Sequence, residues 1–100
     1  MDKKNEQLVV CVISIELLIP MAHSLKEKRK QIKSLKERLK NRFNASVAEV
    51  GSLDEWQRAV LGMSMISNDK RYLEKQYSAI EKMVLEGREV ELINMNIEWL

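Results

Sequence analysis

The sequence is poor in the residues on which several kinds of protein depend. It has one cysteine, Cys11, which excludes a disulfide within the chain and any multi-cysteine zinc or iron–sulfur site. Three glycines and one proline in 100 residues exclude collagen-like and low-complexity chains. The longest apolar run, residues 8–19, is broken by Ser14 and Glu16, is too short to span a bilayer and lacks a secretory cleavage site. We therefore expect a cytoplasmic protein without cofactor, metal or membrane contact.

The composition that remains is that of one globular domain. Hydrophobic residues make up 45% of the chain and charged residues 32%. A chain of 100 residues is long enough for one hydrophobic core. The polar start predicts a loose leader over residues 1–7, followed by a single domain over residues 8–100.

Alternating and apolar segments predict four strands. The first has apolar residues on both faces and is therefore expected in the centre of a sheet, ending before Pro20. The predicted strands cover residues 8–18, 45–50, 56–66 and 90–100.

Two segments with helical spacing separate these strands, over residues 24–43 and 69–86. Ser24 and Glu27 form a capping box, in which the hydroxyl accepts from the amide of Glu27 and the carboxylate reaches back to the cap amide. Gly87 fits a left-handed position after the second helix.

The predicted order is β-α-β-β-α-β. A ferredoxin-like α+β fold satisfies this order, with a four-stranded antiparallel sheet and two helices on one face. The first and third strands, which are the most apolar, should form the central pair.

The charges are distributed unevenly along the chain. Residues 24–42 contain nine Lys or Arg and two Glu, a formal +7 against −5 for the remainder. This asymmetry favours a surface that faces a polyanion, although a charge-rich helix face is also common where nothing binds. Bases near the start of a helix oppose its macrodipole, and Ser24 with the first free amides could join an anion site there. The predicted nucleic-acid-binding residues are Lys26, Arg29, Lys30, Lys33 and Lys40.

A second candidate surface is a possible interaction patch formed by Trp56, Gln57 and Arg58. It combines a large amphipathic ring, an amide and a guanidinium at the start of the predicted third strand. The alternative is that Trp56 covers the edge of the core while Arg58 is simply solvated.

No catalytic constellation can be assembled from the sequence. His23 could serve as a general base, but no second catalytic group lies near it in the sequence, and a loop residue before a helix cap is the favoured interpretation. Cys11 lies among Val and Ile, where a buried thiol is unreactive. Glu16 and Glu49 could approach across strands, but a lone carboxylate pair is a weak signal for hydrolysis. We predict that the protein is not an enzyme.

Several stretches resemble the YlxP-like family of bacterial proteins of unknown function. The resemblance implies a ferredoxin-like fold and, because the family's genes often lie near those for translation initiation and ribosome maturation, a role linked to the ribosome. The family offers no catalytic residues that could be assigned here. The resemblance is carried by residues 9–20, 24–29, 34–39, 42–50 and 56–59.

Two functions remain open. The first is an RNA- or ribosome-associated binding protein whose basic first helix contacts ribosomal RNA or a ribosomal particle through phosphates. The alternative is a homodimeric structural or protein-interaction module without a nucleic-acid role, which would use the open face of the sheet. That face is expected to carry Val10, Val12, Val60 and Ile66, although the core face and the open face of the sheet could be exchanged.

Overall fold

The structure is a computed structural model that describes residues 7–100. The predicted leader therefore lies outside the described residues, apart from the exposed Gln7. The predicted order of strands and helices is confirmed, with shifts of one or two residues at most ends. The elements are β1 (Val9–Leu18), α1 (Leu25–Arg42), β2 (Ser46–Gly51), β3 (Arg58–Ser67), α2 (Lys70–Leu85) and β4 (Glu91–Trp99).

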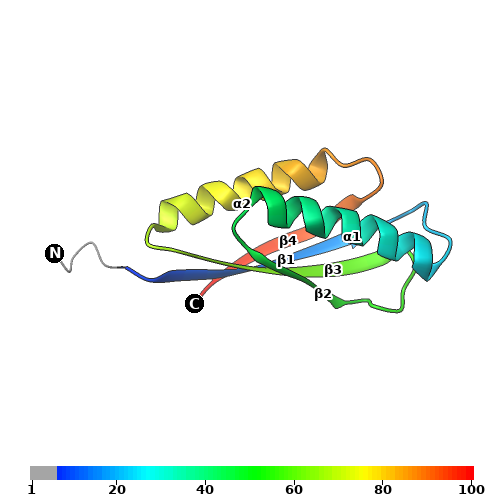
Figure 1. Ribbon diagram of the computed structural model, residues 1–100, viewed down its shortest axis with the longest axis horizontal. Helices are drawn as coiled ribbons and strands as arrows, with labels where there is room; N and C mark the ends of the chain where they lie inside the picture. The colour runs from blue at the N-terminus through cyan, green and yellow to red at the C-terminus, as the bar shows by residue number, and fades with distance from the viewer. Residues whose placement is uncertain (1–6) are drawn as a thin grey trace.

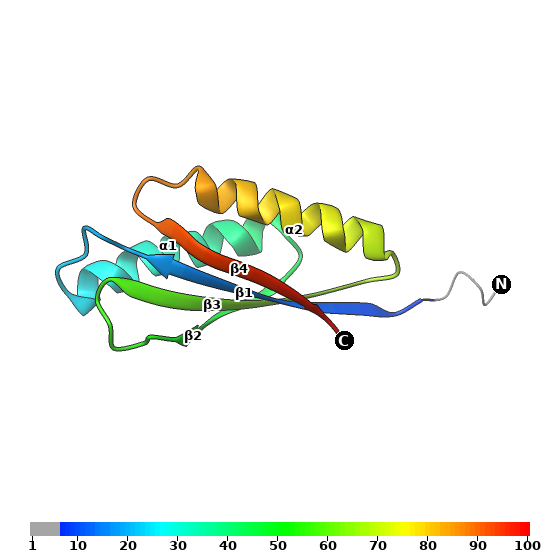
Figure 2. The same cartoon turned by 180° about the vertical axis from the view of Figure 1, so that it is seen from behind.

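The four strands form one antiparallel sheet in the order β2-β3-β1-β4. The prediction that β1 and β3 are central is confirmed. Both helices cover the same face, α1 packing against β2 and α2 against β4 and β3 (Figure 1). Seen from behind, the opposite face of the sheet has no helix in front of it (Figure 2). The fold is the predicted ferredoxin-like α+β arrangement.

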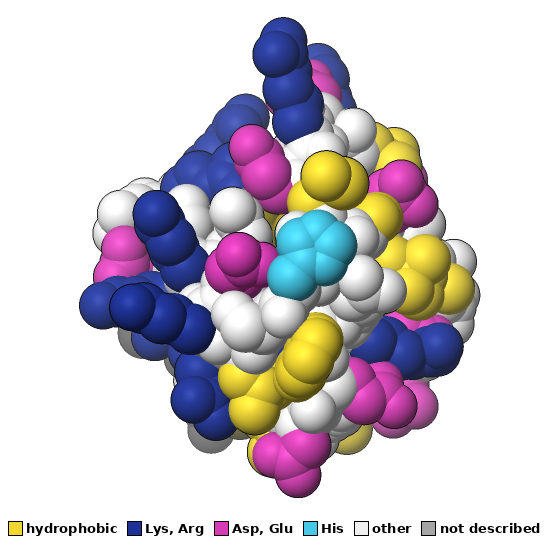
Figure 3. All heavy atoms as spheres, turned by 90° about the vertical axis from the view of Figure 1, so that its right-hand side faces the viewer, with side chains coloured by type: hydrophobic (Ala, Val, Ile, Leu, Met, Phe, Trp, Pro, Cys, Tyr) yellow, Lys and Arg dark blue, Asp and Glu magenta, His cyan; other side chains and the backbone are white. Residues whose placement is uncertain are grey.

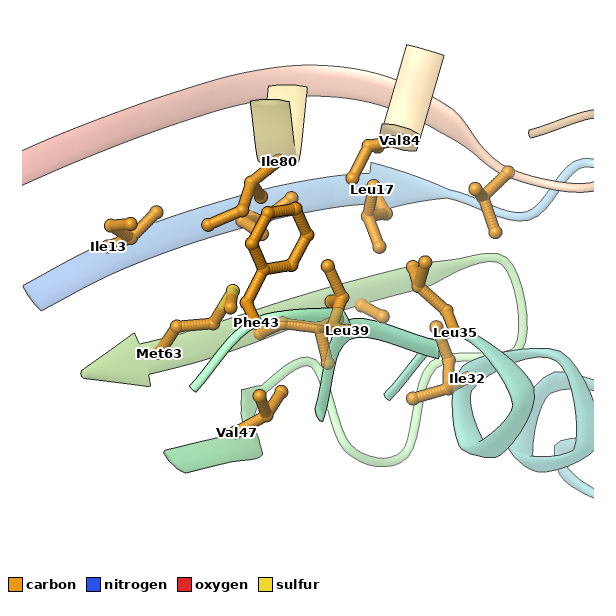
Figure 4. Close-up of a cluster of buried hydrophobic side chains, with 14 of the residues drawn as sticks. Ile13, Leu17, Ile32, Leu35, Leu39, Phe43, Val47, Met63, Ile80 and Val84 are labelled. Carbon is orange, nitrogen blue, oxygen red and sulfur yellow. The ribbon is translucent and has the colours of Figure 1, made fainter. Parts of the chain in front are cut away.

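The core lies between the sheet and the two helices. Alternation along β1 sends Ile13 and Ile15 into the core, where they are fully buried, and leaves Ser14 exposed on the open face. Ile13 pairs with Met63 on one side, and Ile32, Leu35 and Leu39 of α1 come in from the helical layer (Figure 4). The face that β1 turns to the helices is thus the one that holds Val9, Cys11 and Ile13.

Two local predictions are wrong in detail. Residue 56 was expected in the third strand, but β3 begins at Arg58, because Trp56 and Gln57 form a bend before it. Gly87 was expected in the left-handed region, yet no glycine has a positive φ in the described chain. The amide of Gly87 instead donates to the carbonyl of Val84 at 3.1 Å, so a tight turn closes α2 and no left-handed residue is needed.

A buried ion pair joins α1 to the sheet. Lys28 is fully buried, and its Nζ lies 2.7 Å from Oε2 of Glu49, which is 15% exposed. The same Nζ donates to the carbonyl oxygen of Ser52 at 2.6 Å. Ser52 has φ 56, a left-handed conformation that is costly for a residue with a side chain. Lys28 therefore fixes the rotation of α1 against β2 and holds the strained turn after β2.

Replacing Lys28 by Met should destabilise the protein by about 3 kcal/mol, because it leaves Glu49 and the Ser52 carbonyl without their partner. The exposed-side control Lys36→Met should change the free energy of unfolding by less than about 0.5 kcal/mol. Urea denaturation measures both. A loss of the same size in the two variants would contradict the anchoring role of Lys28.

Candidate functional site

The outer surface of α1 carries a continuous row of bases. In the sequence, each buried position of the helix is followed by a base. Because successive residues of an α-helix are turned by about 100°, these bases lie together on one flank of the helix. The residues that α1 buries are Lys28, Ile32, Leu35 and Leu39. We call the row formed by Lys26, Arg29, Lys33, Lys36 and Lys40 the basic stripe. Its gaps of three and four keep it on one side of the helix over about 21 Å.

The basic stripe lies on the β2 side of α1. On the other side of the helix, Glu27 and Gln31 line a hollow together with Glu89, which precedes β4. Lys28 points between the two flanks to Glu49 on β2. The basic stripe lies on the flank of α1 away from Gln31, and this flank therefore runs beside the edge strand β2.

The stripe is not neutralised by the chain itself. Within residues 7–100, the ion pairs are Lys28 with Glu49 and Arg58 with Glu16, and neither includes a residue of the stripe. Four residues of the stripe are exposed and Lys36 is partly exposed. In the end-on view of Figure 3, most Lys and Arg side chains lie to the left of the His23 ring, on the side of the helices. The stripe therefore presents a positive surface to solvent.

The structure modifies the set of bases that the sequence singled out. Lys26, Arg29, Lys33 and Lys40 share one flank, as a common surface requires. Lys30 borders two hollows, one that it shares with Lys26, Arg29 and Lys33 and one that contains Glu27 and Glu89. Lys36 was not among the predicted residues but belongs to the stripe. Counting the alternating gaps of three and four from Lys26 would have found it.

The N-terminus of α1 is already occupied by the chain's own groups. The amide of Glu27 donates to Ser24 Oγ at 3.1 Å, as the capping box predicts. The carboxylate of Glu27, however, accepts from the amide of His23, one residue before the predicted cap amide. The expectation that Ser24 and free amides join an external anion site is weakened, because a carboxylate already lies at this helix end.

The three predicted patch residues have different environments. Trp56 is 53% exposed, so it does not act as a cover over the core edge. Gln57 donates from Nε2 to the carbonyl oxygens of Pro20 and Ala22, both at 3.1 Å, and so holds the β1–α1 loop. Arg58 pairs with Glu16 at 2.8 Å rather than being free in solvent. Of the three, only Trp56 has no side-chain hydrogen bond or ion pair within residues 7–100.

The candidate catalytic groups do not come together. Burial raises the pKa of the Cys11 thiol, against a smaller opposing effect of a hydrogen bond with the Met65 backbone, so little thiolate is available. Glu16 pairs with Val60 on the open face, whereas Glu49 turns to the helical face beside Lys28. The two carboxylates therefore lie on opposite sides of the sheet, and the predicted approach is wrong.

The described chain offers little for metal chemistry. Among residues 7–100, no group of three or more His, Cys, Asp or Glu is arranged to hold a metal ion. In the same part of the chain, no helix has the length and hydropathy needed to cross a membrane. That the protein is not an enzyme stays a prediction.

A family described as "Protein of unknown function (DUF503)" matches residues 10–97. The chain is 34% identical over 84 residues to a relative described as "Uncharacterized protein YlxP" from Bacillus subtilis (strain 168). That match covers 84% of this chain and 91% of the relative. The resemblance to the YlxP-like family is thereby confirmed, and the chain belongs to the DUF503 family.

Proposed function

We propose that the protein binds RNA, alone or in a ribosomal particle, and that the basic stripe of α1 contacts the phosphate backbone. The observation that carries this proposal is that five bases share one flank and none of them is ion-paired within residues 7–100. Successive members of the stripe lie about 5–6 Å apart, so several of them can contact phosphates of one strand. Contacts of this kind give affinity and position with little sequence specificity.

The stripe also costs stability, which a merely solvated helix would avoid. Like charges three or four positions apart destabilise a helix by about 0.2–0.5 kcal/mol per pair. Lys26 and Arg29 form such a pair, and both lie near the positive end of the helix dipole. Arg29 with Lys33, Lys33 with Lys36 and Lys36 with Lys40 form three more. An anion bound along the stripe would relieve this repulsion.

Replacing Arg29, Lys33 and Lys36 by Gln should weaken binding to a duplex RNA of any sequence. With five phosphates neutralised, log K falls against log salt with a slope of roughly −4.5, and with two contacts left the slope becomes roughly −2. Because Gln has a similar helix propensity and the repulsion is relieved, thermal stability should stay equal or rise. Filter binding across a salt series and a thermal melt measure both effects.

A matched control has the same net charge as the triple variant of α1. The triple change of Arg71, Lys75 and Lys82 to Gln removes three exposed bases from α2 instead of α1. It should leave the affinity within about twofold of the unchanged protein, since α2 lies outside the stripe. An equal loss in both triple variants, or no RNA binding at about 150 mM salt, would sink the proposal.

A second candidate function is self-association through the open face of the sheet. Val10, Val12, Val60 and Ile66 all lie on the face away from the helices, as expected, because each alternates with a buried neighbour. Val12 is 36% exposed and Ile66 55%. Apolar side chains gathered on an uncovered sheet favour a partner surface, and a second copy would present the same surface.

Replacing Val12 by Lys tests this candidate without unfolding the protein, because Val12 lies outside the core. If the sheet face joins two copies, the change should convert a dimer to a monomer at high micromolar concentration, as measured by light scattering. Ser78→Lys adds the same charge on an exposed position of α2 and should leave the dimer intact. A monomeric mass for the unchanged protein would rule the dimer out.

A further inference from the structure

One end of the molecule exposes large apolar side chains beside the start of the basic stripe. Met21 is 75% exposed, Leu53 54% and Trp56 53%. Met21 lies in the β1–α1 loop and the other two in the β2–β3 loop. The two loops are joined directly, because Gln57 donates to the carbonyls on both sides of Met21. Hydrophobic side chains are visible above and below the His23 ring at this end (Figure 3).

The loop that carries Trp56 is held firmly in place. The amide of Ile19 donates to the carbonyl of Gln57 at 2.9 Å, directly after Trp56. The amide of Glu55 donates to the carbonyl of Ser52 at 3.1 Å and closes a turn. Lys28 binds that same carbonyl from below. Trp56 is therefore presented by a fixed backbone, which lowers the entropy lost when its ring meets a ligand.

The loop lies at the N-terminal end of the stripe. β2 runs antiparallel to β3 along the flank that holds the stripe, and the loop after it continues toward the end of the molecule at which α1 begins (Figure 1). Lys28, which binds the loop at Ser52, is the neighbour of Arg29 in the stripe. A strand of RNA that follows the stripe from Lys40 toward Lys26 therefore arrives at the loop of Trp56.

The chemistry changes at this point from phosphate-binding to base-binding. Asp54 and Glu55 are exposed beside Trp56, and their carboxylates repel phosphate. Carboxylates instead accept hydrogen bonds from the amino groups of bases, and an indole face stacks on any base. The loop is thus suited to an unpaired nucleobase, while the stripe is suited to the backbone that leads to it.

We propose that Trp56 is a stacking platform for an unpaired base, so that the RNA recognised is a stem that opens into a single-stranded loop or end. The inference rests on the proposed function, because the stripe must first bring the phosphate backbone to α1. Base pairing hides the base faces in a continuous duplex, whereas unpaired bases can splay out and stack on an aromatic side chain.

The test uses Trp56 as its own reporter. The chain has two tryptophans, so Trp99→Phe leaves Trp56 as the only one and keeps an aromatic ring beneath Lys70. The probes are an RNA hairpin with a single-stranded loop and the same stem as a blunt duplex. We expect the hairpin to quench the Trp56 fluorescence and to bind more tightly than the duplex, which should leave the fluorescence nearly unchanged.

The variants separate this inference from the proposed function. Trp56→Ala should lower the affinity for the hairpin by roughly 5- to 150-fold and leave the affinity and salt slope for the duplex unchanged. Trp56→Phe should restore most of the preference. Equal affinity of Trp56→Ala and the unchanged protein for the hairpin would overturn the inference while the stripe still binds. Absence of binding to either RNA would overturn both, and would leave the patch to a protein partner.

Discussion

The ion pair of Lys28 with Glu49 sets the arrangement on which the candidate surface depends. Lys28 occupies a position of α1 that faces the sheet, in the row that Ile32 and Leu35 continue with apolar side chains. As a lysine it also binds the carbonyl of Ser52, so one side chain links helix, edge strand and loop. A buried pair of this kind contributes little net stability compared with apolar packing. What it adds here is a fixed rotation of α1, which turns the basic stripe outward along β2.

The stripe and the loop follow from this one constraint. With α1 rotated by one residue, the bases would turn toward the sheet or toward α2, and the row along β2 would be lost. The Ser52 turn, which has φ 56, would lose the ammonium group that stabilises its carbonyl. The opposite face of the sheet is uncovered and carries apolar side chains such as Val12 and Ile66 beside Ser14 and Ser64. The two faces of the protein therefore differ in what they can bind.

The fold could be predicted from the sequence because its signals are local. The alternation in β1, the helical spacing of apolar residues in α1 and the Ser24 cap can each be recognised from a few neighbouring residues. The role of Lys28 was not predicted. The gap of seven residues between Leu25 and Ile32 does indicate a core-facing position between them, at residue 28. Its partner Glu49 becomes visible only when the register of β2 and β3 is known.

The candidate site was predictable in part for the same reason. Four of the five predicted bases share a flank, since helical spacing alone decides this, and Lys36 follows from the same arithmetic. The contacts of Gln57 and Arg58 could not be predicted, because their partners lie 35 to 42 positions away in the sequence. Contacts at such sequence distances follow from the three-dimensional fold and leave no mark on local spacing.

The most direct test of the account is a map of the RNA-contacting surface in solution. Backbone amide and arginine and lysine side-chain signals can be followed by NMR while a stem–loop RNA is added. The account predicts shifts along one flank of α1, at Arg29, Lys33 and Lys36, and in the loop that ends at Trp56, with none along β4. Shifts concentrated on the open face of the sheet, or an absence of shifts at physiological salt, would contradict it.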